Sequence, residues 1–134
     1  LWSRHFWFSW VESTPRLDVD ALLVGSSDLR AVRAIDSKNG HVRWSTDVPG
    51  LTWGTPLVIG DTVYAGTAGQ TGVLIEHHAA LVAPDRKSGA LLWSTPLDEP
   101  KGASVFGCVS SLAESNGMVV ACTVDGTLAV YPLR

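Results

Sequence analysis

Glu76, His77 and His78 are the residues of this 134-residue chain whose types best suit metal binding. On a β-strand, the side chains of Glu76 and His78 would face one side and that of His77 the other. A carboxylate and an imidazole make up half of a tetrahedral zinc site, but no further Cys or His lies nearby in the sequence. We therefore predict no metal site and place Glu76 and His78 on a solvated loop or strand end. Metal binding by these two residues is the alternative.

This cluster lies in an insertion relative to the rest of the chain. Gly25 precedes Asp36 by 11 residues, whereas the corresponding Gly66 precedes Asp85 by 19. Residues 69–78, GQTGVLIEHH, thus hold about eight extra residues. Insertions in repeat proteins map to loops, often on the binding face, so we predict a loop here. A binding function for this loop is a further hypothesis.

The two cysteines, Cys108 and Cys122, are too few to form a disulfide scaffold. We predict that they lie on the two strands of one hairpin that turns near Asn116 and Gly117. Two buried thiols are the expected state, and pairing between them is left open. The sequence contains no G-x-S-x-G, phosphate-loop or Rossmann motif. We therefore predict no catalytic residue.

A repeated spacing of Asp, Gly and Trp is the clearest pattern in the chain. Residues 34–44, AIDSKNGHVRW, and residues 83–93, APDRKSGALLW, both read Ala-x-Asp-x-x-x-Gly-x-x-x-Trp. An Asp at a strand end accepts hydrogen bonds from turn N–H groups, and Gly adopts the positive φ that a tight hairpin often requires. A Trp offers the neighbouring repeat a large apolar face and one N–H donor. We predict structural roles for all six positions: Asp36, Gly40, Trp44, Asp85, Gly89 and Trp93.

The remaining tryptophans divide into two groups. Trp2, in LWSRHF, occupies the same slot of the repeat as Trp44 and Trp93. Three others, Trp7, Trp10 and Trp53, lie outside that slot, and we expect them to pack in the core or between repeats. For Trp53, in GLTWGTP, the alternative is a position lining a central channel.

The elements that position these residues are short β-strands. Runs rich in Val, Leu, Tyr and Thr are bounded by Gly, Asn, Asp and Pro, and no segment shows a sustained helical period. Each repeat holds about four antiparallel strands in roughly 45 residues, which suits a blade of a β-propeller. A propeller ring typically has about 4–8 blades, so we predict an all-β chain of about three blades from an incomplete ring. The approximate repeats of this single partial propeller span residues 2–44, 44–93 and 93–134.

The composition excludes several classes of function. The net charge is −3 and 17% of the residues are charged, with both signs interspersed, so we predict no nucleic-acid partner. No apolar run reaches the roughly 18–20 residues of a membrane-spanning helix, so we predict no membrane span. The first ten residues lack the pattern of a signal peptide. Since the chain starts at Leu1 and its only methionine is Met118, we expect it to be a piece of a longer protein or a processed product.

Two segments, LRAVRAIDSKNGHVRW and LVAPDRKSGALLW, resemble the tryptophan-docking repeat of the quinoprotein-like (pyrroloquinoline quinone-type) β-propeller family. That repeat reads Leu-Tyr-Ala-Leu-Asp-x-x-Thr-Gly-x-x-x-Trp. Asn39 and Ser88 replace its Thr, and Pro84 and Pro132 depart from it near the Asp position. The resemblance covers nearly the whole chain, most weakly residues 1–19. It implies a propeller from a bacterial envelope or secreted protein, with a periplasmic or secreted location.

The resemblance leaves more than one function open, because one fold hosts many activities. Our leading hypothesis is a non-catalytic binding or scaffold propeller, whose partners are the remaining blades of the ring and other proteins. The alternative is part of a quinone-dependent dehydrogenase, with pyrroloquinoline quinone and Ca²⁺ at the axis of a complete ring. Such enzymes carry a disulfide between adjacent cysteines, and this sequence has no Cys-Cys pair. A sensor propeller attached to a signalling domain is a third hypothesis, and we expect no cofactor in this chain on its own.

Overall fold

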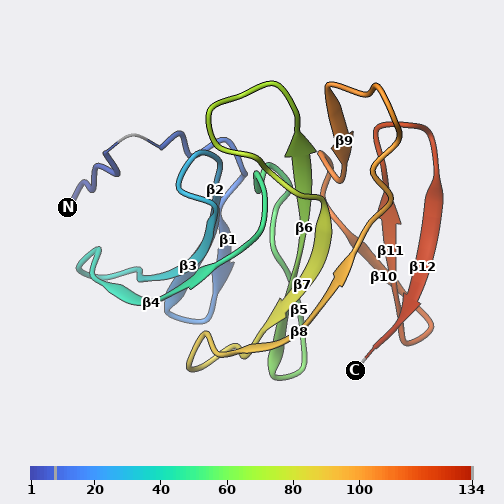
Figure 1. Ribbon diagram of the computed structural model, residues 1–134. Coiled ribbons are helices and arrows are strands. Elements are labelled where there is room, and N and C mark those ends of the chain that lie inside the picture. Colours follow the sequence, from blue (N-terminus) through green and yellow to red (C-terminus); the bar gives the residue numbers. More distant parts are fainter. Residues whose placement is uncertain (8, 134) are drawn as a thin grey trace.

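A computed structural model describes residues 1–7 and 9–133, and in these residues the chain is all-β, without a helix (Figure 1). The strands form three antiparallel sheets that follow one another along the chain and do not close into a ring. This arrangement confirms the predicted fold class. Because the described residues form no helix, none of them crosses a bilayer in a long apolar helix.

The first sheet has the order β1-β2-β3-β4. Each strand pairs with its neighbour through a short turn, and the outermost strand carries Trp44 opposite Ala34. The register shifts between Ala34 and Ile35, which places a bulge next to the Trp. The four strands are β1 (Arg16–Asp18), β2 (Ala21–Ser26), β3 (Ala31–Asp36) and β4 (Val42–Asp47).

The second sheet repeats this plan with one addition. Trp93 lies opposite Ala83, and the register shifts at the same place in the repeat, between Ala83 and Pro84. The far half of the long strand β6 also pairs with β9, which the sequence did not indicate. The strands are β5 (Leu57–Ile59), β6 (Thr62–Gln70), β7 (Ala80–Pro84), β8 (Leu91–Pro96) and β9 (Val105–Gly107).

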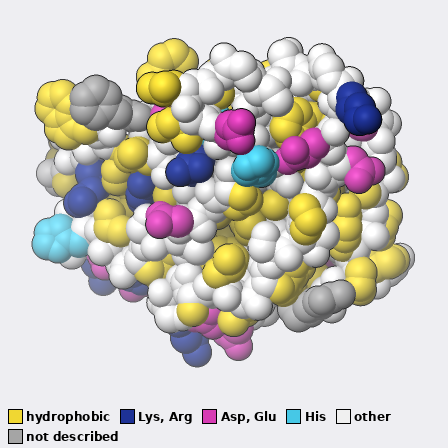
Figure 2. Space-filling view, in the orientation of Figure 1, with side chains coloured by type: hydrophobic (Ala, Val, Ile, Leu, Met, Phe, Trp, Pro, Cys, Tyr) yellow, Lys and Arg dark blue, Asp and Glu magenta, His cyan; other side chains and the backbone are white. Residues whose placement is uncertain are grey.

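The third sheet has three strands in the order β10-β11-β12: β10 (Ala113–Ser115), β11 (Met118–Cys122) and β12 (Leu128–Pro132). Val119 and Ala121 face the second sheet and are fully buried. On the opposite face, Met118, Leu128 and Val130 are exposed. Hydrophobic side chains are visible over this part of the molecule in Figure 2.

The core consists of two apolar layers, one on each side of the second sheet. The first layer joins Leu23, Val32 and Trp44 of the first sheet to Val63 and other residues of the second. The second layer joins the second sheet, including its strand β9, to the third sheet; its members include Tyr64, Leu81, Phe106, Leu112 and Val119. Consecutive residues of one strand therefore serve different layers, as the two-residue period of a strand dictates.

The N-terminal segment lies against the outward side of the first sheet. Ser13 Oγ accepts a hydrogen bond from the backbone N–H of Gly25, at 2.7 Å, and the guanidinium of Arg33 lies 4.8 Å from the ring centre of Phe6. Trp7 and Trp10, however, are exposed in this chain. The expectation that both pack in a core or between repeats was therefore wrong, because the described residues form no sheet on that side.

The cysteines also differ from the expectation. Cys108 follows β9 and packs against the second sheet, where Gly66 leaves room for it, whereas Cys122 ends β11. They are therefore not on the two strands of one hairpin. Both thiols are free; Cys108 is buried but Cys122 is exposed. Burial raises the pKa of the Cys108 thiol to about 11.

Candidate functional site

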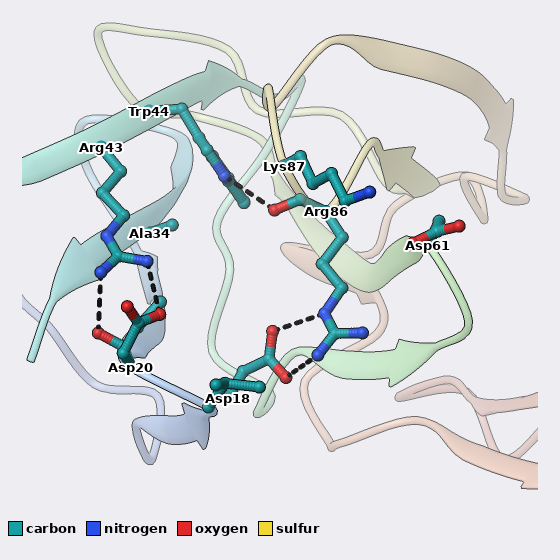
Figure 3. Close-up of a pocket in the computed structure, with 10 residues that line it drawn as sticks. Asp18, Asp20, Ala34, Arg43, Trp44, Asp61, Arg86 and Lys87 are labelled. Carbon is teal, nitrogen blue, oxygen red and sulfur yellow. Dashed lines mark hydrogen bonds and ion pairs between the residues drawn. The ribbon is translucent and has the colours of Figure 1, made fainter.

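A groove of about 410 Å³ lies between the first and second sheets, along the repeat motif (Figure 3). Trp44 and Ala34 contribute its apolar wall, and charged side chains from both sheets surround it. The lining residues are Asp18, Val19, Asp20, Ala21, Ala34, Arg43, Trp44, Asp61, Arg86 and Lys87. This groove brings together one Trp of the repeat and the turn of the next repeat.

Trp44 crosses from the first sheet to the second. Its Nε1–H donates to the carbonyl oxygen of Arg86 at 3.1 Å, and the indole is only 8% exposed. The ring lies over Gly89, where a Cβ atom would come within 2.7 Å of Trp44 Cδ2. Thr46, two residues further along β4, donates its hydroxyl to the Gly89 carbonyl at 2.5 Å. A side chain at position 89 would therefore displace the indole.

Trp2 makes the same set of contacts with the first sheet. Its Nε1–H donates to the carbonyl oxygen of Ser37 at 2.9 Å, and a Cβ at Gly40 would lie 2.5 Å from Trp2 Cε3. Gly40 and Gly89 have φ values of 75° and 73°, in the left-handed region that glycine enters at little cost. The two turns are thus equivalent receptors for an indole.

The two turns are held by the aspartates of the motif. Asp36 Oδ1 accepts from the backbone N–H groups of Lys38 at 2.9 Å and Asn39 at 3.2 Å. Asp85 Oδ1 accepts from the N–H of Ser88 at 2.7 Å, and from its hydroxyl at 2.6 Å. The Ser88 hydroxyl and backbone hydrogen bonds hold the pKa of Asp85 below its usual value. Both carboxylates therefore accept hydrogen bonds from groups of their own turns.

Two arginines form ion pairs with aspartates at the groove and beside it. Arg86 Nε donates to Asp18 Oδ2 at 2.7 Å and Arg86 Nη2 to Asp18 Oδ1 at 2.6 Å, which joins the second sheet to β1 (Figure 3). Arg43 bridges Asp20 and Asp36 at 2.7 and 2.6 Å within the first sheet. Hydrogen bonds from Arg43 hold the pKa of both carboxyl groups below the usual value. Sequence reasoning missed these pairs; the basic residue directly after Asp85 was the only local signal for one of them.

The other Trp of the motif, Trp93, has a different environment from Trp44. It is half-buried and makes an edge-on contact with Tyr64, with ring centres 6.1 Å apart. Among the described residues, its buried Nε1 has no hydrogen-bond partner, and the same holds for Nε1 of Trp53. Trp53 lines a second, smaller hollow with Trp10, Leu51 and other residues.

The Glu76–His78 cluster lies at the end of a loop that leaves β6 at Gln70 and turns back to pair with it. Gln70 pairs with His77, and the residues between them form an exposed loop in the predicted insertion. Glu76 and His78 are exposed, and His78 Nδ1 lies 3.1 Å from Glu99 Oε1. His77 is 7% exposed, and neither of its ring nitrogens has a hydrogen-bond partner among the described residues. Burial lowers the pKa of His77.

The residues of this chain do not by themselves fit a quinone site with a metal ion. Across residues 1–7 and 9–133, no three His, Cys, Asp or Glu side chains converge as a metal-binding group. Two of the carboxylates that line the groove, those of Asp18 and Asp20, already accept hydrogen bonds from guanidinium groups. We therefore derive no chemical step through a quinone.

Solved structures with similar folds are bacterial propeller proteins. BamB from Moraxella catarrhalis matches with a TM-score of 0.65 and 17% identity, over 90% of this chain and 33% of its own. The quinohemoprotein alcohol dehydrogenase ADHIIG from Pseudomonas putida HK5 matches with a TM-score of 0.70 and 20% identity, over 92% and 19%. The quinohemoprotein alcohol dehydrogenase from Comamonas testosteroni gives 0.64 and 20%, over 84% and 17%. The chain thus spans a third or less of the length of these proteins, and at these identities the likeness shows the fold alone.

Comparison at the level of sequence identifies the family. The chain matches no curated protein sequence. The family model for the outer membrane protein assembly factor BamB, built on the PQQ repeat, matches residues 1–134, which is the whole sequence. The chain therefore belongs to the BamB-like family of PQQ-repeat β-propellers.

Proposed function

We propose that this chain forms part of a non-catalytic propeller that acts as a binding or scaffold surface in the bacterial envelope. The observation that carries the proposal is the use of the charged side chains at the groove. Two of the aspartates that line the groove, Asp18 and Asp20, are held by arginines; beside the groove, Asp36 is held by Arg43 and Asp85 by its own turn. Groups engaged in this way stabilise the sheet-to-sheet contact and are not placed to transfer protons to a substrate.

The proposal extends to partners and location. Trp2, Trp44 and the turns that receive them join successive sheets, so the same geometry suits a longer ring of sheets. The partners are then the other blades of the ring and envelope proteins that bind its surface, as the family description of an assembly factor suggests. The same family supports a periplasmic or secreted location.

Part of a quinone-dependent dehydrogenase is the second candidate function. It is favoured by the TM-score of 0.70 with a quinohemoprotein alcohol dehydrogenase. In such a ring, pyrroloquinoline quinone and Ca²⁺ would take their ligands from several blades, and these sheets would supply only a share of them.

A titration of the full-length parent protein with quinone and Ca²⁺ separates the two candidates, because this chain alone would supply only a share of the ligands. Tryptophan fluorescence is followed while pyrroloquinoline quinone is added with and without Ca²⁺, and dye reduction is then assayed with simple alcohols. We expect no saturable quenching in the micromolar range and no turnover. A Trp53→Phe variant serves as the matched control, because the buried Nε1 of Trp53 has no hydrogen-bond partner among the described residues. Calcium-dependent quenching with turnover would overturn the scaffold proposal in favour of the dehydrogenase.

A further inference from the structure

The smaller hollow, of about 180 Å³, lies where the segment before β1 and a turn of the first sheet meet the second sheet. The indoles of Trp10 and Trp53 line it, together with the carboxylates of Glu12 and Asp28. All of its lining residues lie between positions 10 and 70, so the hollow is built by segments that the chain itself supplies. At about 30 Å³ per water molecule, it has room for about six waters or for a small organic group.

The walls of this hollow are held by backbone hydrogen bonds. The carbonyl oxygen of Trp10 accepts from the N–H of Ser27 at 3.1 Å and from its hydroxyl at 3.3 Å, which fixes Trp10 beside the turn that contains Asp28. On the other side, Leu51 is hydrogen-bonded to β6, and Gln70 is the last residue of that strand. A ligand would therefore meet walls that are already in place, which lowers the cost of binding.

The two indoles offer aromatic carbon to a ligand. The Nε1 atom of Trp53 is buried although its side chain is half-buried as a whole, so the accessible part of this indole is carbon. The backbone of Trp10 is fixed, but its side chain is 71% exposed, so most of its indole is available for contact. The ring of a Trp attracts a cation through its quadrupole more strongly than that of Tyr or Phe.

The charge of the hollow is negative. Glu12 and Asp28 each contribute a carboxylate, and among the described residues no Lys or Arg lines the hollow. Within the same part of the chain, neither carboxylate forms an ion pair, whereas Asp18 and Asp20 of the groove are both paired with arginines. Aromatic carbon beside unpaired carboxylates is complementary to an organic cation.

We propose that this hollow binds a small organic cation whose ammonium nitrogen carries apolar substituents. The substituents contact the indoles of Trp10 and Trp53, and the positive charge lies near Glu12 and Asp28. A bare ammonium, such as that of lysine, is more strongly hydrated and loses more when it leaves water. The site uses neither the Trp motif nor the groove, so the inference does not depend on the proposed scaffold function.

Titration of the full-length parent protein with choline tests this site. Saturation-transfer difference NMR is suited to roughly millimolar affinity, which we expect because cation–π contacts at partly exposed sites are weak. The matched control ligand is neohexanol, the uncharged carbon isostere of choline. We expect saturable binding of choline and at least about fivefold weaker binding of neohexanol.

Substitutions assign the binding to the hollow. Trp10→Leu and Trp53→Leu keep an apolar side chain but remove the aromatic ring, and each should weaken choline binding about two- to fivefold. Trp7→Leu is the matched control, because Trp7 is similarly exposed but does not line the hollow. Asp28→Asn should weaken binding at low salt and less at high salt, whereas Asp61→Asn, at the groove, should leave it unchanged.

Several results would overturn the proposal. They are the absence of saturation with choline, equal affinity for neohexanol, and an equal effect of Trp7→Leu and Trp10→Leu. Circular dichroism checks the fold of each variant, and Trp10→Leu, at an exposed side chain, tests the site even if Trp53→Leu does not fold. Phosphatidylcholine vesicles should not bind, because Glu12 and Asp28 would repel the phosphate beside the ammonium. Vesicle binding that choline displaces would overturn the assignment to a free cation.

Discussion

Replacement of Trp44 by Ala tests the contact between the first and second sheets most directly. The indole is 8% exposed and packs in the first apolar layer, so the substitution removes nearly the whole of a buried side chain. Truncation of a buried Trp costs about 3–5 kcal/mol. The lost bond to Arg86 O falls within that range, because a net hydrogen bond contributes only about 0.5–1.5 kcal/mol. A domain with a stability of about 5–15 kcal/mol would lose a large part of it.

Gly89→Ala sharpens the test, because its cost depends on Trp44. The substitution places a Cβ about 2.7 Å from the indole, at a φ of 73°. Gly60→Ala is the matched control: its φ is 59°, but nothing lies within 4 Å of the added Cβ. We expect Gly60→Ala to cost about 1–2 kcal/mol from backbone strain alone. Gly89→Ala should cost about 1–3 kcal/mol more from overpacking.

In a Trp44→Ala background, the two glycine substitutions should cost the same, because the clash is gone. Urea unfolding followed by circular dichroism gives the free energies without relying on tryptophan fluorescence. All variants are compared at one protein concentration, since self-association shifts apparent stability. Equal costs of the two glycine substitutions in the wild-type background, or a Trp44→Ala cost below about 1 kcal/mol, would refute the reasoning.

Three further outcomes are expected from the same measurement. Trp93→Ala and Trp53→Ala should each cost less than Trp44→Ala, because neither indole N–H has a hydrogen-bond partner in the described part of the chain; an equal cost would contradict this. Arg86→Met should lower the urea midpoint at low salt, and the difference should shrink in 1 M NaCl because the Asp18 pair is partly exposed. Since the pKa of His77 lies below its ordinary value of 6.5 in the folded chain, stability should fall as the pH drops below about 6.5. His77→Leu should remove that part of the slope, and an unchanged slope would contradict the assignment.

The local parts of this fold could be predicted from the sequence. The strands around Gly60-Asp61 and Asn116-Gly117, and the turns of the Asp-Gly-Trp motif, depend on residues within about ten positions of one another. The turn residues and the strand-forming runs predict the same strands, so the copies of the repeat could be aligned from the sequence alone. The positive φ at Gly40 is an example of such a local requirement.

The long-range parts could not be predicted in the same way. Asp18 and Arg86 are 68 positions apart, and neither is marked by a pattern of its own. β9 pairs with β6, although β7, β8 and the loop before β9 separate the two strands in the sequence. The four-strand repeat contains no such pairing. The exposure of Trp7 and Trp10 depends on which sheets surround them, so an aromatic residue type alone was a poor guide.

The length of β6 has a consequence for how the chain folds and opens. Its residues are hydrogen-bonded to β5 and β7 at one end and to β9, Leu51 and His77 at the other. Thr62 to Gly69 are all buried, so no other strand is enclosed over so many consecutive residues. Amide protons here can exchange with solvent only when partners distant in sequence separate together. The middle of β6 should therefore be the last backbone to exchange and the part that unfolds only with the whole chain, while β1 and β10 open first. Several of its partners are remote, so the folding rate should be limited by closing these long loops.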